Sequence, residues 1–265
     1  MTMIQIIVLA LIQGLSEFLP VSSSAHLILG SVVFGWQDQG LVFDLATHLG
    51  TLAAVFVYFR HDLLDLVRVW VRPAGGAIDQ RHRSMGLYLV FASIPAILVG
   101  ALFHDVVETL LRDVRVIAWM TICFGLLLWW VDAKCSRDLE MGQMTMKRAI
   151  FFGLAQVAAL VPGVSRSGVT ITAGRFLGFS SSASARFSFL LSIPIIAAAG
   201  GYGWLRVITG DAQIDWVQFF LAVVLSAFAG WLCIAAFLAL LQRVGLVPFV
   251  IYRLILGVVL LWMLY

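Results

Sequence analysis

The chain has 265 residues, of which 62% are hydrophobic and only 12% are charged. Because about a quarter of the residues in an average soluble domain are charged, this composition excludes a water-soluble globule and indicates an integral membrane protein. The formal net charge of +3 comes from 17 basic and 14 acidic residues, most of which lie between apolar runs. Such a charge distribution reports membrane topology, and it excludes nucleic acid as a partner.

Six apolar stretches approach the roughly 20 residues that a helix needs to cross a bilayer. They are 41–59, 86–103, 116–131, 187–207, 217–240 and 248–265. Two further stretches, 1–36 and 149–180, are apolar at their ends but broken by PVSSS at 20–24 and PGVSRSG at 162–168. Non-helical backbone at membrane depth is tolerated only inside protein or beside a water-filled cavity. We therefore predict two re-entrant helical hairpins with buried tips.

Basic residues in the connections predict the orientation, because lysine and arginine accumulate on the cytoplasmic side. The connection 60–85 carries five arginines and 132–148 carries four basic residues, so both are expected inside. The connections 104–115 and 208–216 are richer in acids and are expected outside. This count requires each hairpin to return to the side it entered, and it places both termini outside.

The chain then divides into two halves of opposite orientation, about 1–132 and 148–265, each with one hairpin and three spans. The sequence QGLSE at 13–17 is echoed by GLAQ at 153–156, and a Pro/Ser turn follows each segment. Inverted repeats with paired broken helices typically place a binding site near the bilayer midplane. The predicted fold is an all-α integral membrane protein built as an inverted repeat, with its chemistry where the two tips meet.

The first tip offers an acid and hydroxyl groups. Gln13 and Glu17 are four residues apart and share a helical face, and an intramembrane carboxylate is costly enough to indicate function. The alternative is a structural acid paired with a buried arginine. Ser22 and Ser23 lie at a helix start with His26 one turn beyond. They suggest a nucleophile and a proton-transfer partner, although helix-capping serines and a core histidine explain the same pattern.

The second tip combines the elements of an anion site. Glycines allow close backbone approach, a helix start presents free N–H groups, and Arg166 has a planar fork that suits phosphate oxygens. The predicted substrate-binding residues are Ser22, Gly163, Ser165, Ser167, Gly168 and Thr170. The alternative is that Arg166 only forms a structural bridge to Glu17.

Five other polar residues carry less weight. Asp44 and His48, four residues apart, either line an outward vestibule or sit at its rim. Arg175, Arg186 and Arg253 are expected to extend their charged ends toward the cytoplasmic surface.

The segments 13–26 (QGLSEFLPVSSSAH) and 162–170 (PGVSRSGVT) resemble the motifs of the bacterial undecaprenyl-diphosphate phosphatases of the bacitracin-resistance type. The resemblance extends to IPA at 94–96, FSFLL at 187–191 and PFVIYR at 248–253. It implies removal of the terminal phosphate of undecaprenyl diphosphate at the outer face of the inner membrane, which recycles the lipid carrier of cell-wall precursors.

The resemblance also implies roles for the residues at the tips. Ser23 would be the nucleophile, His26 its proton-transfer partner or the acid that protonates the leaving group, and Arg166 the diphosphate clamp. Glu17 and Gln13 would form a metal or base site for Mg²⁺ or Ca²⁺. Gln13 stands where many family members have glutamate, so substrate oxygens and water are expected to supply much of the coordination. Attack by water that Glu17 activates would use the same residues.

A different class of function remains open at this stage. Inverted repeats with re-entrant tips also occur in secondary transporters, and a phosphorylated lipid could be carried or flipped across the membrane without hydrolysis. The sequence leaves the oligomeric state open, a homodimer included.

Overall fold

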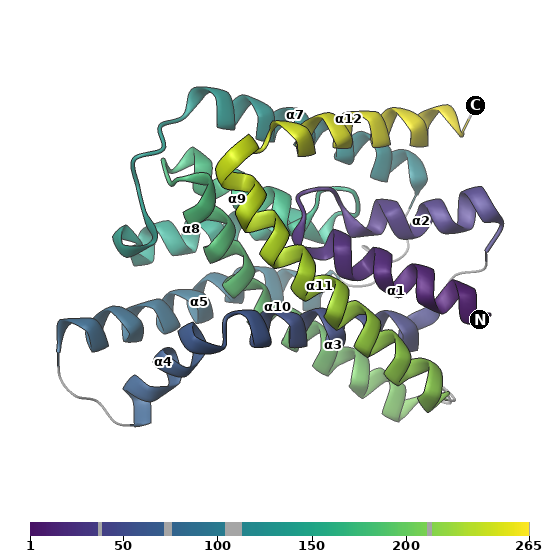
Figure 1. Ribbon diagram of the computed structural model, residues 1–265, viewed down its shortest axis with the longest axis horizontal. Helices are drawn as coiled ribbons and strands as arrows, with labels where there is room; N and C mark the ends of the chain where they lie inside the picture. Colours follow the sequence, from purple (N-terminus) through teal and green to yellow (C-terminus); the bar gives the residue numbers. More distant parts are fainter. Residues whose placement is uncertain (37–38, 72–75, 104–112, 211–213, 265) are drawn as a thin grey trace.

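The computed structural model describes residues 1–36, 39–71, 76–103, 113–210 and 214–264. The regular structure of these ranges is helical (Figure 1). The α-helices are α1 Met3–Phe18, α2 Ser23–Phe34, α3 Gly40–Tyr58, α4 Arg60–Val71, α5 Ala77–Leu102, α7 Val114–Lys134, α8 Met146–Val157, α9 Arg166–Phe176, α10 Ser181–Thr209, α11 Trp216–Val244 and α12 Val247–Trp262. Two 3₁₀ turns, η1 Met141–Gln143 and η2 Ala158–Leu160, flank α8.

Five described helices are long and apolar enough to cross a membrane: α3, α5, α7, α10 and α11. They correspond to five of the six predicted spans, which confirms the class of an integral membrane protein. The sixth predicted span, 248–265, contains α12, which has 16 residues. At 1.5 Å per residue α12 is about 24 Å long, shorter than the roughly 30 Å hydrocarbon core of a bilayer.

Both interrupted stretches form a helix, a break and a second helix. In 1–36, α1 ends at Phe18 and α2 begins at Ser23; in 149–180, α8 and η2 precede α9. The residue before each second helix has a positive φ angle, 74° at Ser22 and 71° at Ser165. Left-handed backbone at a residue with a side chain costs on the order of 1–3 kcal/mol and persists only where the surroundings impose it. The two breaks therefore share the same unusual turn into the second helix.

Helices of the first half pack mainly against helices of the second half. Helix α1 packs against α11, and α8 packs against α5; α3 contacts α10 and α11, and α7 lies along α12 (Figure 1). Two glycines permit the close approaches. A Cβ at Gly14 would lie 2.6 Å from the Ser226 carbonyl oxygen of α11, and a Cβ at Gly153 would overlap the Ala92 carbonyl group of α5. Small residues at such contacts are typical of membrane helix pairs.

Different helices lie at the two ends of the molecule. The start of α1 and the end of α12 lie at one end, at right in Figure 1, and α4 with the start of α5 lies at the opposite end. Residues 104–112 of the predicted connection 104–115 and residues 211–213 of 208–216 lie outside the described residues.

The expectation that Arg175 extends to the surface is wrong. Its side chain is fully buried, and its Nε donates to Asp132 Oδ1 at 2.8 Å. The guanidinium also donates to carbonyl oxygens of Ser136 and Phe179. A buried cation is stable only when it is paired and its N–H groups are satisfied, and here Arg175 fastens the 132–148 connection to α9.

Candidate functional site

A cavity of about 910 Å³ lies between the two breaks and the helices α3, α5, α7 and α10. Its polar walls come from both breaks and from α1 and α3, and its apolar walls come largely from α2, α5, α7 and α10. The lining residues that carry the argument are Gln13, Glu17, Ser23, His48, Ser165 and Arg166. A concave site with few convergent polar groups and apolar walls is typical of a small-molecule or lipid site.

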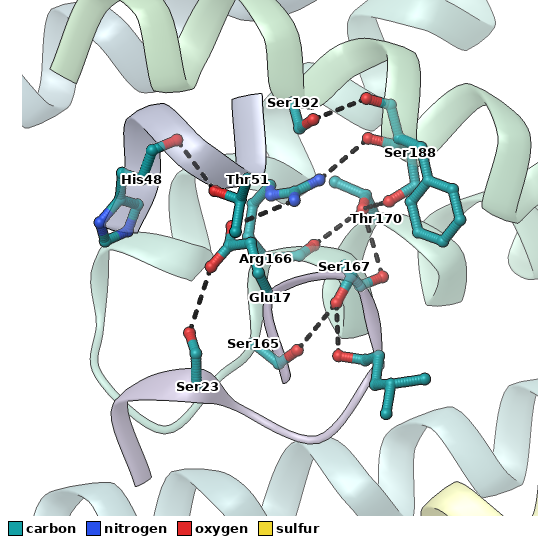
Figure 2. Close-up of polar contacts among 12 residues, drawn as sticks. Glu17, Ser23, His48, Thr51, Ser165, Arg166, Ser167, Thr170, Ser188 and Ser192 are labelled. Atoms are coloured by element: carbon teal, nitrogen blue, oxygen red, sulfur yellow. Dashed lines mark hydrogen bonds and ion pairs between the residues drawn. The ribbon is translucent and has the colours of Figure 1, made fainter. Parts of the chain in front are cut away.

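Glu17, near the end of α1, joins three segments through its carboxylate. Oε1 accepts a hydrogen bond from Arg166 Nη2 at 3.2 Å. Oε2 accepts from Gln13 Nε2 at 2.9 Å and from Ser23 Oγ at 3.3 Å. Figure 2 shows the carboxylate between Ser23 and Arg166, which come from different breaks. The structure thus brings together four of the predicted site residues.

Arg166 is the first residue of α9 and is held on two sides. Besides the bond to Glu17, its Nη1 donates to the Ser188 carbonyl oxygen of α10 at 2.9 Å. The ion pair between Arg166 and Glu17, which the sequence offered as a purely structural alternative, is present. Both residues also line the cavity, with side chains 12% and 9% exposed, so a ligand in the cavity can reach them.

The two breaks are also hydrogen-bonded directly to each other. The backbone N–H of Gly163 donates to Ser24 Oγ at 3.2 Å, and Ser167 Oγ donates to the Leu19 carbonyl oxygen at 2.7 Å. Gly163 has a φ of 93°, and a Cβ there would overlap the Ile117 carbonyl oxygen of α7. The breaks therefore form one hydrogen-bonded unit pressed against α7.

His26 is not placed against Ser23 as the spacing suggested. Its Nδ1 donates to the Ser22 carbonyl oxygen at 2.7 Å, and its Nε2 is 2.6 Å from the Tyr252 hydroxyl oxygen of α12. The imidazole also stacks on the Tyr252 ring, with 5.5 Å between the ring centroids. Both ring nitrogens are thus engaged elsewhere, and among the described residues Ser23 Oγ donates to the ionisable group of Glu17.

The predicted substrate-binding residues separate into two sets. Ser22, Gly163 and Ser165 line the cavity. The other three do not line it and serve the tip itself: Ser167 donates to Leu19, the Gly168 N–H donates to Ser165 Oγ at 3.1 Å, and Thr170 Oγ1 donates to the Arg166 carbonyl oxygen at 2.7 Å. In this structure their polar groups hold α9 and its arginine, and their contact with substrate stays a prediction.

Arg253 is the residue whose importance the sequence analysis missed. It is fully buried instead of reaching the surface, and its guanidinium donates to carbonyl oxygens of both breaks. The acceptors include Pro20 at 3.3 Å, Gly163 at 3.0 Å and Val164 at 3.0 Å, while Nε donates to Thr121 at 3.1 Å. The signal in the sequence is the single basic residue of the apolar stretch 248–265, whose place near the cytoplasmic end of that stretch favours a surface position.

The donor set around Glu17 fits a divalent cation only in part. Among the described residues, no three histidine, cysteine or acidic side chains gather as a metal site. However, the Gln13 side-chain oxygen is buried without a hydrogen-bond partner, beside Glu17. Carboxylate and amide oxygens are ligands that hard cations prefer, so Glu17 and Gln13 fit a partly substrate-coordinated Mg²⁺ or Ca²⁺.

Comparison with known proteins places the chain in a family. The family model described as bacitracin resistance protein BacA matches residues 6–259. The chain belongs to the BacA family. Similar relatives include an undecaprenyl-diphosphatase from Teredinibacter turnerae, 49% identical over 98% of each chain, and undecaprenyl-diphosphatase 2 from Stutzerimonas stutzeri, 52% identical over 98% of each chain. The family resemblance drawn from the two motifs is thereby confirmed.

Proposed function

We propose that the protein is an undecaprenyl-diphosphatase, an enzyme that converts undecaprenyl diphosphate to undecaprenyl phosphate and inorganic phosphate. The relatives that share about half of its residues carry that name. The observation that carries the proposal is the convergence of Ser23, Glu17 and Arg166 in one cavity with apolar walls. A hydroxyl, a carboxylate and a guanidinium suit phosphoryl transfer, which depends mainly on positioning and charge neutralisation.

In the proposed reaction, Ser23 Oγ attacks the terminal phosphorus and Glu17 takes its proton. The bond between that phosphorus and the bridging oxygen breaks, and undecaprenyl phosphate leaves. Water then attacks the phosphoserine, releasing inorganic phosphate and restoring the hydroxyl. Because Glu17 is 3.3 Å from Ser23 Oγ, it replaces His26 as the proposed base. Direct attack by water that Glu17 activates is the competing route.

Arg166 is proposed as the clamp on the diphosphate. Its guanidinium presents a planar fork that matches two phosphate oxygens, and the Ser188 carbonyl group fixes one edge of the fork. Substrate oxygens would compete with Glu17 for Nη2, which would leave the carboxylate available as a base. Ser22, Gly163 and Ser165 would surround the same phosphate group from the cavity walls.

Glu17 and Gln13 would hold the divalent cation, Mg²⁺ or Ca²⁺, that the family resemblance implies. When bound, such an ion neutralises charge on the diphosphate oxygens and makes the lipid phosphate a better leaving group. Glu17 would then serve both as a ligand of the ion and as the base for Ser23.

We also propose that the fold is an inverted repeat of six spans and two re-entrant hairpins, with halves about 1–132 and 148–265. The exchanged packing of α1 with α11 and of α8 with α5 supports it. So do the matching positive φ angles at Ser22 and Ser165. The short helix α12 would cross where the bilayer is locally thinned, or it would be completed by flanking residues.

The cavity is proposed to open to the periplasmic side of the inner membrane. Its outer lining comes from the first residues of α3 and α7 and the last turns of α10, including Asp44, Val114 and Arg206. The connections rich in basic residues, 60–85 and 132–148, lie at the other ends of these helices. Because connections rich in basic residues are cytoplasmic, this arrangement supports a cavity that opens on the periplasmic side.

The experiment is a phosphate-release assay with purified protein in detergent. Undecaprenyl diphosphate is supplied with Mg²⁺ or Ca²⁺, with and without a chelator, and Glu17→Gln serves as the inactive control. We expect release by the wild-type protein that the chelator abolishes. Wild-type protein that releases no phosphate but moves a phosphorylated lipid across vesicles would contradict the enzyme and favour a carrier.

A further inference from the structure

The side-chain amide of Gln13 occupies an unusual position in the site. Its Nε2 lies 2.9 Å from Glu17 Oε2 and 3.4 Å from His48 Nε2, so two acceptors on different helices converge on one nitrogen. The residue is 1% exposed, and its Oε1 is buried without a hydrogen-bond partner among the described residues. A buried unsatisfied oxygen is costly, on the order of 1–3 kcal/mol. The arrangement calls for an explanation beyond packing.

His48 is oriented in the way that metal-binding histidines are. Its Nδ1 donates to the Asp44 carbonyl oxygen one turn earlier in α3, at 2.7 Å. A carbonyl oxygen only accepts, so Nδ1 carries the proton and the lone pair lies on Nε2. Figure 2 shows the His48 ring on the same side of the site as the Glu17 carboxylate and Ser23, and all three residues line the cavity. A backbone carbonyl that fixes the other ring nitrogen is a common second partner of histidine ligands.

The Gln13 amide nitrogen therefore occupies a position from which a cation could contact both Glu17 Oε2 and His48 Nε2. Its two N–H bonds offer positive charge to a carboxylate oxygen and to an imidazole lone pair. Turning the amide by half a rotation would bring Oε1 toward Glu17 and His48, so that three lone pairs would face one point. The rotated amide is stable only with a cation between these three lone pairs, and the cation would also give Oε1 the partner that it lacks.

We propose that His48 is a direct nitrogen ligand of the active-site cation, together with Glu17 and Gln13 Oε1, and that the Gln13 amide turns over when the ion binds. The proposal rests on the proposed function, because it names the ligand set of the same site. Imidazole binds first-row transition ions better than Mg²⁺ or Ca²⁺, and Mn²⁺ accepts both oxygen and nitrogen ligands. The site should therefore bind Mn²⁺ more tightly than either.

The test measures Mn²⁺ directly, by electron paramagnetic resonance of the purified protein without a polyhistidine tag. Binding is titrated with Mn²⁺ alone and with Mn²⁺ plus inorganic pyrophosphate, and pulsed measurements report coupling to a histidine nitrogen. We expect nitrogen coupling in the wild-type protein. We expect His48→Ala to remove the coupling and weaken Mn²⁺ binding by roughly ten- to a hundredfold. Gln13→Glu should strengthen binding and keep the coupling, because a carboxylate replaces a neutral oxygen.

The matched control is His61→Ala, which removes an exposed histidine of α4 and should leave both the coupling and the affinity unchanged. Absence of nitrogen coupling in wild-type protein with Mn²⁺ bound overturns the proposal without needing a variant that folds poorly. Coupling that persists in His48→Ala overturns it as well. The phosphate-release assay is independent: nitrogen-coupled Mn²⁺ in a protein that releases no phosphate would retain the ligand assignment and remove the phosphatase.

Discussion

At the scale of single residues, the site depends on how one carboxylate is shared. Glu17 accepts hydrogen bonds from Gln13, Ser23 and Arg166, which come from its own helix and from both breaks. In a cavity with apolar walls, such charge-assisted bonds are stronger than the same contacts in water. Each partner therefore has a separate role that substitution can test.

Arg166→Lys should lose most of the activity although it keeps the positive charge. The guanidinium reaches the Ser188 carbonyl oxygen and the Glu17 carboxylate with different nitrogens, and an ammonium group cannot reproduce that fork for phosphate. We expect phosphate release to fall more than tenfold. Arg186→Lys is the control, because Arg186 forms a half-exposed pair with Asp62 away from the cavity. Near-wild-type turnover of Arg166→Lys would mean that only positive potential is required.

Ser23→Ala distinguishes the two routes of attack. If Ser23 is the nucleophile, turnover under saturating substrate should collapse while lipid diphosphate still binds through Arg166. If water attacks, the variant loses only the hydrogen bond to Glu17, and a defect of roughly ten- to a hundredfold is expected. We expect the collapse. Retention of a tenth of wild-type turnover would assign the activated nucleophile to water.

At the scale of the elements, the site is made by two helices that begin in mid-protein. Helices α2 and α9 start directly after Ser22 and Ser165, both with positive φ angles, and the two breaks bond to each other through Ser24 and Ser167. Behind them, the Arg253 guanidinium of α12 binds carbonyl oxygens of both breaks. The buried Arg253 guanidinium thus holds the two strained turns in place relative to each other.

Arg253→Leu should destabilise the protein and remove activity together. The substitution leaves buried carbonyl oxygens of Pro20, Gly163 and Val164 without these donors, for an expected loss of about 2–4 kcal/mol. Thermal unfolding in detergent should show a lower midpoint, and phosphate release should fall more than tenfold. Arg243→Leu, at an exposed position of α11, should change neither. An unaltered melting midpoint for Arg253→Leu would show that the carbonyl contacts do not stabilise the breaks.

At the scale of the whole molecule, the two halves exchange their packing partners. Helix α1 packs against α11 and α8 packs against α5, and residues of both halves line the cavity, so neither half encloses it alone. The cavity lies toward the helix ends opposite the basic connections 60–85 and 132–148. The orientation of the molecule therefore decides which side of the membrane supplies substrate.

Cysteine labelling tests this orientation. In a background without Cys123, Cys135 and Cys233, single cysteines replace the exposed residues Thr2 and Lys134. A membrane-impermeant reagent added to intact cells should label Thr2→Cys and leave Lys134→Cys unlabelled until the cells are opened, because basic connections stay inside. Labelling of Lys134→Cys from outside would invert the topology and the proposed opening of the cavity.

The amino-acid sequence by itself determined the membrane class, the five long spans, the two breaks and the family, because apolar length and Pro/Ser/Gly interruptions are local properties of the chain. It also named Glu17, Ser23 and Arg166, which the structure brings together. The partners of His26, His48 and Arg253 were decided only by the tertiary structure. Each contacts residues at least 35 positions away, and spacing along a helix cannot say which distant carbonyl, hydroxyl or amide will satisfy a buried polar side chain.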